Sequence, residues 1–432
     1  MRCLVSMINF FKQNINSNLL SALTFKGLSV LKGPALLIML VIFLTPEQQG
    51  YWYLITNLGA LAFNADFGSG LLTMQHIANH TKSKFNAIEM RRNFSRLISS
   101  SYKFLFTSLF IISLLLIPTG YMLMNDQGYL TIYAWFFYLA SSVPVHFLLF
   151  ELYLLQGFGS IVQSYIFRSI FVVLSLIICT LLLYSGMSLL SLGISNIIAS
   201  LIVIPIVVRK FNYGKVRDSQ SYPQIKTFIL TKTRVQYITS WLAGYAMFFM
   251  IVPLVMYFKG PVIAGQIGLG LALVKAISAL SLAPMESSLT LLGKAVGDKN
   301  KIQLMSYFKK SLLFGVLIFI LAGISSIILL EIIRDIPIFD KRLPSLLVYS
   351  ALLIAEFLYL IMNLLAKKVR IFLIEPYAIA NVFFGISVFG NAIFWLAFFS
   401  LEIWSIMQAL LYLLVGLPLF YRIYSVTMKN FS

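Results

Sequence analysis

Long apolar runs, each about as long as a membrane is thick, alternate with short polar segments along the whole chain. A helix crosses the hydrocarbon core of a bilayer with roughly 20 apolar residues. The runs are rich in Leu, Ile and Phe and lack the period of two that is typical of barrel strands. The pattern therefore predicts an all-α integral membrane protein with twelve transmembrane helices. We expect these helices near residues 21–44, 52–74, 104–123, 132–155, 169–184, 190–208, 235–257, 268–292, 311–333, 345–365, 378–399 and 405–424.

The composition agrees with lipid as the main solvent. Of the 432 residues, 60% are hydrophobic and only 11% are charged, whereas about a quarter of the residues in a soluble domain are charged. This difference excludes a soluble enzyme and a disordered chain. The two cysteines, Cys3 and Cys179, are too few for a disulfide framework, and no spacing of Cys and His residues indicates a metal site.

The formal net charge of +19 is unevenly distributed. With twelve helices, both termini and every second loop share one side of the membrane, and most of the 33 Lys and Arg residues lie there. Because positively charged loops stay in the cytoplasm, we expect both termini to be cytoplasmic. The basic excess is then an orientation signal, and no nucleic-acid partner is expected. Residues 1–18 are expected to form a retained amphipathic segment at the membrane surface.

The longest inward loop, 209–234, separates the first six predicted helices from the last six. Its Gly, Asp, Ser and Pro residues suit a linker. We therefore expect an N-terminal lobe over 1–208 and a C-terminal lobe over 235–432.

The two halves also resemble each other weakly. The shift that places Gly50 on Gly268 also places Asn57 on Lys275. Together with the even number of helices, this indicates a parallel internal repeat. Two six-helix lobes related by a parallel pseudo-twofold axis around a central cavity are a recurring design of transporters.

Ionisable side chains occur in the predicted helices, where each is costly unless it faces a cavity or a partner. We interpret the basic ones as a cationic site for an anionic cargo, and the acidic ones as sites for a coupling ion, H⁺ or Na⁺, or as gates. The basic residues are Lys26, Lys32, Arg168 and Lys275, and the acidic residues are Asp66, Glu151, Glu286 and Glu356.

A structural interpretation stays open for several of these residues. Lys26, Glu151 and Arg168 lie near the inner surface, where salt bridges between helices or snorkelling explain them equally well. Asp66 lies in the segment FNADFGSG, whose glycines allow close helix contact, so helix packing or gating is as good an interpretation as ion binding. For His146, within a predicted helix, a proton relay is one interpretation and a structural role is the other.

Uncharged polar residues extend the candidate cavity lining. Tyr359 and Asn363 follow Glu356 at the spacing of one helical face, and Asn57 and Asn64 lie at such a spacing on the second predicted helix. The sequence contains no nucleotide-binding phosphate loop and no protease or hydrolase motif. We therefore expect a transporter, without a resident cofactor or metal, rather than an enzyme.

The segment TPEQQGYWY at 45–53, with NADFGSG at 64–70, resembles the Wzx-type O-antigen flippases. These belong to the polysaccharide-transporter branch of the multidrug/oligosaccharidyl-lipid/polysaccharide exporter superfamily. The resemblance implies alternating access, a cationic lumen and an ion gradient. It implies as cargo an undecaprenyl-diphosphate-linked oligosaccharide, carried across a bacterial inner membrane. The resemblance implies membrane lipids, a polysaccharide polymerase and chain-length machinery as partners. It also implies that the transporter is a monomer.

Three other functions are alternatives to this one. An ion-coupled exporter of small cationic drugs from the same superfamily would use the carboxylates as its cargo site. Flippases of the peptidoglycan precursor generally have fourteen helices. A membrane polysaccharide polymerase or ligase needs a large outward loop, and the outward loops expected here are short.

Overall fold

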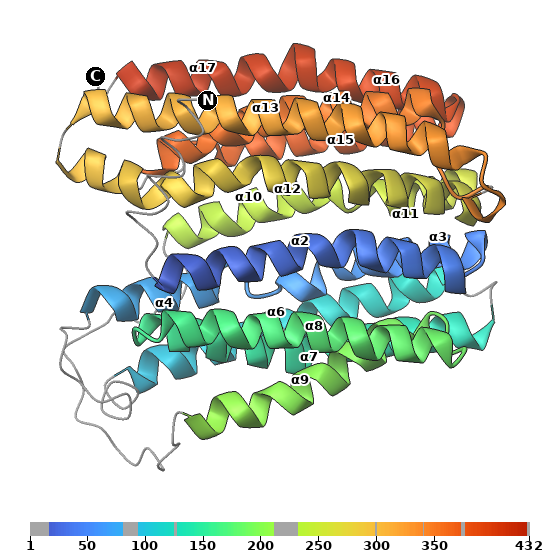
Figure 1. The fold of residues 1–432 in the computed structure, drawn as a ribbon, viewed down its shortest axis with the longest axis horizontal. Coiled ribbons are helices and arrows are strands. Elements are labelled where there is room, and N and C mark those ends of the chain that lie inside the picture. The colour runs from blue at the N-terminus through green and yellow to red at the C-terminus, as the bar shows by residue number, and fades with distance from the viewer. Residues whose placement is uncertain are drawn as a thin grey trace. The chain divides into compact units, whose positions relative to one another are not determined.

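The computed structural model describes residues 17–80, 94–124, 128–210, 232–298, 300–339, 341–372 and 376–429, apart from a few side chains within these ranges. In this part of the chain every regular element is a helix (Figure 1). The prediction of an all-α protein is therefore confirmed. The predicted surface segment 1–18 and most of the predicted linker 209–234 fall outside the described residues.

Ten of the described helices are long and apolar enough to cross a membrane. They are 97–124, 129–157, 161–184, 190–209, 238–259, 261–286, 301–334, 346–370, 378–398 and 401–429. The first predicted span corresponds to α2 (Ser17–Phe43), which contains Pro34. The second corresponds to a helix that is broken in two.

The prediction of one continuous helix over 52–74 is wrong. The chain forms α3 (Pro46–Gly59), a single 3₁₀ turn η1 (Ala62–Asn64) and α4 (Ser69–His80). Phe67 and Gly68 adopt φ angles of 43° and 78°, which lie in the left-handed region that no right-handed helix tolerates. The length of the apolar run correctly predicted a membrane span here. It contains no information about this local change of backbone conformation.

The seventh and twelfth predicted spans are also interrupted. α10 (Lys232–Phe248) ends just before α11 (Ile251–Lys259), and Pro253 stands in the first turn of α11, where its missing N–H costs no hydrogen bond. The last span comprises α16 (Leu401–Leu411), a π-helical turn η4 (Tyr412–Gly416) and α17 (Leu417–Lys429). Such π turns are often found at functional sites.

The chain folds into two compact units. Unit 1 consists of residues 1–36 and 62–229, and unit 2 consists of residues 37–61 and 230–432. The predicted lobes assign residues 37–61 to the first half, whereas these residues group with the second unit. The chain therefore passes between units after Leu36, close to Pro34, and again after Leu61, at the break between α3 and α4.

In unit 1, α7 packs against α4, α6, α8 and α9. It carries His146, Glu151 and Tyr153 on one helix, and it is buried along much of its length. Besides α4, η1 and the part of α2 up to Leu36, the described helices of this unit are α6 (Ser95–Met124), α7 (Tyr129–Gly157), α8 (Ile161–Tyr184) and α9 (Leu190–Lys210).

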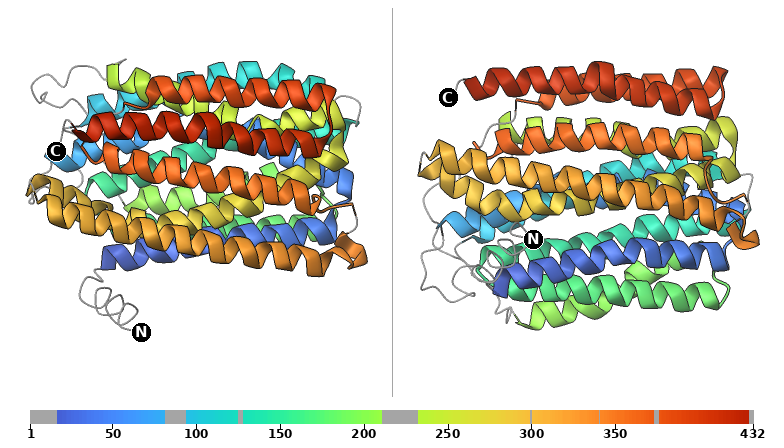
Figure 2. Two further views of the ribbon diagram at one scale, coloured as in Figure 1. Left: turned by 90° about the horizontal axis from the view of Figure 1, so that it is seen from above. Right: turned by 45° about the horizontal axis from the view of Figure 1, so that its top comes forward.

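In unit 2, α14 packs against α12, α13, α16 and α17 (Figure 2). α3 packs on α12 at a very short distance, because glycines face the neighbouring helix. A Cβ atom at Gly50 would lie 2.0 Å from the Pro261 carbonyl oxygen, and one at Gly268 would lie 2.3 Å from the Tyr53 ring. The remaining helices of this unit are α12 (Pro261–Gly297), α13 (Lys301–Arg334), η3 (Pro337–Phe339), α14 (Leu346–Arg370) and α15 (Ala378–Phe398).

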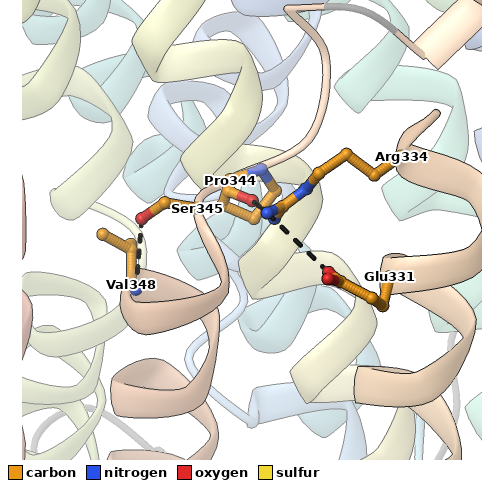
Figure 3. A network of polar contacts seen from close by, with 5 residues as sticks. All are labelled: Glu331, Arg334, Pro344, Ser345 and Val348. Atoms are coloured by element: carbon orange, nitrogen blue, oxygen red, sulfur yellow. Dashed lines mark hydrogen bonds and ion pairs between the residues drawn. The ribbon is translucent and has the colours of Figure 1, made fainter.

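Polar contacts fix the start of α14, the helix that carries Glu356 (Figure 3). Arg334, the last residue of α13, donates to the Pro344 carbonyl at 3.0 Å and lies 3.8 Å from Glu331. Ser345 caps α14 by accepting a hydrogen bond from the Val348 amide at 3.4 Å. These contacts satisfy a backbone N–H at the helix start that has no partner inside the helix.

Candidate cargo and ion sites in the two units

Lys275 lies in the middle of α12, where the break between α10 and α11 provides an acceptor. Its ammonium donates to the Phe248 carbonyl at 3.2 Å and lies 4.5 Å from the centre of the Phe249 ring. Phe248 is the last residue of α10, and carbonyls at a helix C-terminus are short of intrahelical partners and carry partial negative charge. The broken helix therefore holds a partly buried cation with neutral groups.

Glu356 on α14 faces the same region of unit 2. It accepts a hydrogen bond from Ser278, one turn after Lys275 on α12, and it interacts electrostatically with Lys275. The two charged groups do not come within the 4.0 Å of a direct ion pair. The sequence placed these two residues as separate candidates, and the structure brings them together.

Aromatic and amide side chains continue this site. The Tyr359 ring lies edge-on to Phe248 at 4.5 Å and 6.5 Å from the Tyr412 ring of the π turn. Tyr412 is hydrogen-bonded to Gln408, which in turn accepts from the Asn391 amide at 2.9 Å. We use the name Lys275–Glu356 cluster for Lys275, Ser278, Glu356, Tyr359 and Tyr412.

Glu286 lies apart from this cluster although it shares a helix face with Lys275. Its carboxylate forms an ion pair of 2.8 Å with Lys367, at the end of α14. The neighbouring Lys368 is fully buried and donates to the Tyr424 hydroxyl at 2.6 Å. Both lysines therefore join α14 to other helices of unit 2.

The remaining uncharged candidates are separated from one another. The Asn57 amide donates to the Tyr53 carbonyl in its own helix at 2.8 Å, whereas Asn64 lies in the 3₁₀ turn and belongs to unit 1. The two residues therefore do not lie on one continuous helix. Asn363 is partly buried on α14, beyond Tyr359, with no hydrogen-bonding partner among the described residues.

In unit 1, Lys32 on α2 donates to the Ser175 hydroxyl of α8 at 3.2 Å. A neutral hydroxyl at this distance is a weak partner for a partly buried ammonium. Lys32 lies two residues before Pro34 and close to the point where the chain leaves the unit. Lys26 lies one and a half turns earlier on α2, and its side chain is not among those described.

Arg168 on α8 packs over a tyrosine rather than against a carboxylate. Its guanidinium lies 4.6 Å from the centre of the Tyr153 ring, and its Nε and Nη2 atoms are buried with no hydrogen-bonding partner in the described part of the chain. Gly70 packs against the same ring, since a Cβ atom there would lie 2.5 Å from Tyr153 Cδ2. Glu151 is fully buried on α7 and accepts a hydrogen bond from the Tyr102 hydroxyl of α6.

Asp66 lines a cavity of about 90 Å³ inside unit 1. The cavity lies at the break between α3 and α4, beside α7, where His146 Nε2 lies 2.6 Å from the Ala62 carbonyl oxygen. Its lining consists of Phe63, Asn64, Asp66, Leu105, His146, Leu149, Phe150 and Tyr153.

Sequence reasoning missed the polar partners that complete these sites. Ser278, Tyr412 and Gln408 carry no charge, and serine and tyrosine are common in membrane helices. The spacing from Lys275 to Ser278 is compatible with one helix face, but a neighbour of Glu356 on another helix cannot be found from spacing alone.

Neither a protein-family model nor a curated protein sequence matches the chain. Several solved structures match the chain. A multidrug resistance MATE family transporter of the MOP superfamily, in an inward-facing conformation, matches with a TM-score of 0.56 and 15% identity over 94% of this chain and 95% of that chain. The chain shares the MATE fold.

Two further structures support this likeness. MATE in complex with MaD3S matches with a TM-score of 0.55 and 16% identity over 96% of both chains. An outward-facing multidrug resistance MATE family transporter matches with a TM-score of 0.52 and 12% identity, again over 96% of both chains. The likeness to the MATE fold confirms the predicted architecture of twelve membrane helices in two lobes.

Proposed function

We propose that the chain is a flippase for an undecaprenyl-diphosphate-linked oligosaccharide of the O-antigen type. It moves this lipid from the cytoplasmic to the periplasmic leaflet of a bacterial inner membrane by alternating access, driven by a gradient of H⁺ or Na⁺. Both termini are cytoplasmic, the transporter acts as a monomer, and its product supplies a polysaccharide polymerase with its chain-length machinery. The resemblance of segment 45–70 to the Wzx-type flippases supports the choice of cargo.

The environment of Lys275 is the structural observation that carries the proposal. An ammonium group has three N–H donors, and the Phe248 carbonyl accepts one of them. Glu356 balances part of the charge from a longer distance. A diphosphate would offer Lys275 stronger, charge-assisted hydrogen bonds than these neutral groups do. Lysine also makes mobile, strongly hydrated contacts, which suit both the capture and the release of a cargo.

The cargo itself explains why a protein route with fixed cations is needed. A diphosphate with attached sugars would have to lose its hydration to cross hydrocarbon, and burying such groups without partners is prohibitively costly. A partly buried ammonium supplies a partner part-way across the membrane. In this proposal Lys32 provides such a contact in unit 1, where its present partner is a hydroxyl.

Glu356 is the carboxylate that we assign to the coupling ion. It lies close enough to Lys275 to interact with it electrostatically. Glu356 competes with an anionic cargo for Lys275, so protonation of Glu356, or binding of Na⁺ to it, would change the affinity of Lys275 for the cargo. Loading the ion and binding the cargo would then be linked through one pair of residues.

A second candidate, export of small organic cations, is supported by two observations. The structurally similar MATE transporters are described as multidrug resistance proteins. Glu356 also lies among the rings of Tyr359 and Tyr412, and a carboxylate beside aromatic faces can bind an organic cation. In this reading Lys275 would neutralise the site in the absence of the drug.

A complementation experiment separates the two candidates. The chain is expressed in a bacterium that lacks its own O-antigen flippase, and surface polysaccharide and drug susceptibility are both measured. We expect restored polysaccharide, unchanged drug susceptibility and loss of polysaccharide in Lys275→Gln at equal expression. Lys310→Gln, which changes an exposed lysine of α13, is the matched control. Drug resistance without polysaccharide would instead support the exporter.

A further inference from the structure

The break between α3 and α4 forms a second polar site, in unit 1. The cavity there has a volume of about 90 Å³, which is room for several water molecules, since about 10–15 Å³ of such a volume is enough for one. It is well below the roughly 300–1,000 Å³ of pockets that hold drug-sized ligands. Three titratable side chains line it: Asp66 from the segment after the 3₁₀ turn, and His146 and Tyr153 from α7.

The hydrogen bond of His146 fixes which ring nitrogen is available. Its Nε2 lies 2.6 Å from the Ala62 carbonyl oxygen. Because a carbonyl oxygen only accepts, Nε2 must carry the hydrogen and donate it. In the neutral ring Nδ1 is therefore the basic atom, and it is the atom that can take up a further proton.

The charges around this ring come from four elements. Asp66 interacts electrostatically with His146. α7 itself contributes Tyr153 and Glu151, of which Glu151 accepts from Tyr102 of α6. Arg168 of α8 packs over the Tyr153 ring. Glu151 thus interacts with Tyr102, and Arg168 packs on the Tyr153 ring. Asp66 is the acidic residue that lines the cavity together with His146.

We propose that Asp66 and His146 bind one proton between them and form a proton site of unit 1. In the empty state the imidazole is neutral and Asp66 is a carboxylate. On loading, a hydronium ion in the cavity gives its proton to Nδ1 and remains as water, and the resulting imidazolium faces the Asp66 carboxylate. The pair then changes from a net charge of −1 to zero, which favours the loaded state in surroundings of low dielectric constant.

The donor set favours a proton over a metal cation. Hard cations require several oxygen ligands. Two backbone carbonyls of the broken segment are already engaged, because Ala62 accepts from His146 and Ala65 accepts from the Ser108 hydroxyl at 2.6 Å. The remaining oxygens that line the cavity from this segment belong to the side chains of Asn64 and Asp66.

The site is coupled by structure to the point where the chain changes units. Unit 1 resumes at Ala62, and the Ala62 carbonyl is the acceptor of the His146 bond. A protonated ring donates a stronger hydrogen bond than a neutral one. Protonation of His146 therefore strengthens the hydrogen bond between α7 and the segment that begins at Ala62. The idea that proton binding at this site drives transport rests on the proposed function. The existence of the proton site does not depend on that function.

Proton uptake by the full-length protein in lipid nanodiscs tests the site without any cargo. The protons bound between about pH 8.5 and pH 5.5, the range in which histidine ordinarily titrates, are counted with an indicator dye. We compare wild type with Asp66→Asn, His146→Gln and the double variant. Gln keeps a donor for the Ala62 carbonyl but does not titrate. Glu331→Gln, at an exposed carboxylate, is the control.

We expect each single variant to bind one proton fewer than wild type, and the double variant also to bind only one fewer, because the two residues share the proton. Unchanged uptake in either single variant, or a loss of two protons in the double variant, would overturn the site. So would uptake that falls when sodium replaces potassium. If His146→Gln does not fold, Asp66→Asn and the ¹⁵N NMR spectrum of the wild-type histidines decide the question. Normal uptake without lipid flipping would count against the proposed function alone.

Discussion

The Lys275 ammonium of α12 donates a 3.2 Å hydrogen bond to the Phe248 carbonyl, the last carbonyl of α10. A partly buried cation is thus held by the free end of an interrupted helix and not by a direct ion pair. Broken helices whose ends bind charged groups are a recurring feature of transporter sites. The break between α10 and α11 and the position of Lys275 therefore have to be considered together.

The first prediction concerns the affinity of the Lys275–Glu356 cluster for diphosphate. Lys275→Gln should weaken binding of an undecaprenyl-diphosphate sugar on the order of tenfold to a hundredfold, because a hydrogen bond to a charged group contributes about 1.5–3 kcal/mol. Binding to purified protein in nanodiscs measures this, with Lys310→Gln as the control. Equal affinity of wild type and Lys275→Gln would show that this lysine does not contact the cargo.

The second prediction concerns coupling. Glu356→Gln keeps an oxygen that can accept from Ser278 but removes the charge that attracts Lys275. In proteoliposomes the wild type should flip faster when an inward gradient of H⁺ or Na⁺ is imposed, and Glu356→Gln should flip at the same rate with and without it. Glu331→Gln should respond as wild type does. An undiminished response in Glu356→Gln would assign coupling to another group.

The third prediction concerns the contact between α3 and α12. Gly50→Ala would place a methyl group 2.0 Å from the Pro261 oxygen, so the two helices must separate. Overpacking of this kind costs about 1–3 kcal/mol or more. Gly244→Ala in α10, where the added Cβ would have no neighbour within 4 Å, should be neutral or slightly stabilising. Thermal unfolding in detergent compares the two, and equal melting temperatures would contradict the close contact.

The fourth prediction concerns Glu286 and Lys367. Their ion pair of 2.8 Å is partly exposed, with 31% and 18% of the respective side chains accessible, so a coupling energy of about 1 kcal/mol or less is expected. A double-mutant cycle of Glu286→Gln and Lys367→Met, read by unfolding, measures it. We expect the double variant to retain gradient-driven flipping. If Glu286→Gln no longer responds to the ion gradient, Glu286 takes part in ion coupling, contrary to this expectation.

The sequence predicted the helices well because lipid imposes a simple rule on the length of an apolar segment. It could not predict the breaks at 60–68, 249–250 and 412–416 with the same rule. Each break depends on a few backbone angles or one proline within a run that stays apolar. The breaks matter for function, since the first two adjoin His146 and Lys275 respectively.

The candidate site was predictable in its charged members and not in its pairings. Burial of a charge is costly enough to single out Lys275 and Glu356 from the sequence. Which of the carboxylates lies near Lys275 depends on how α12 and α14 pack. Glu286, on the same helix as Lys275, is instead paired with Lys367, while Glu356 reaches the cluster from a segment far along the chain.

Flipping by purified protein tests the central claim most directly. Wild-type protein is reconstituted in proteoliposomes that contain a fluorescent undecaprenyl-diphosphate oligosaccharide in one leaflet, and a parallel set contains a fluorescent cationic dye as soluble cargo. The account predicts that wild type moves the lipid-linked sugar at a rate at least about tenfold above that of Lys275→Gln and does not transport the dye. Transport of the dye, with the lipid-linked sugar left in its original leaflet, would contradict it.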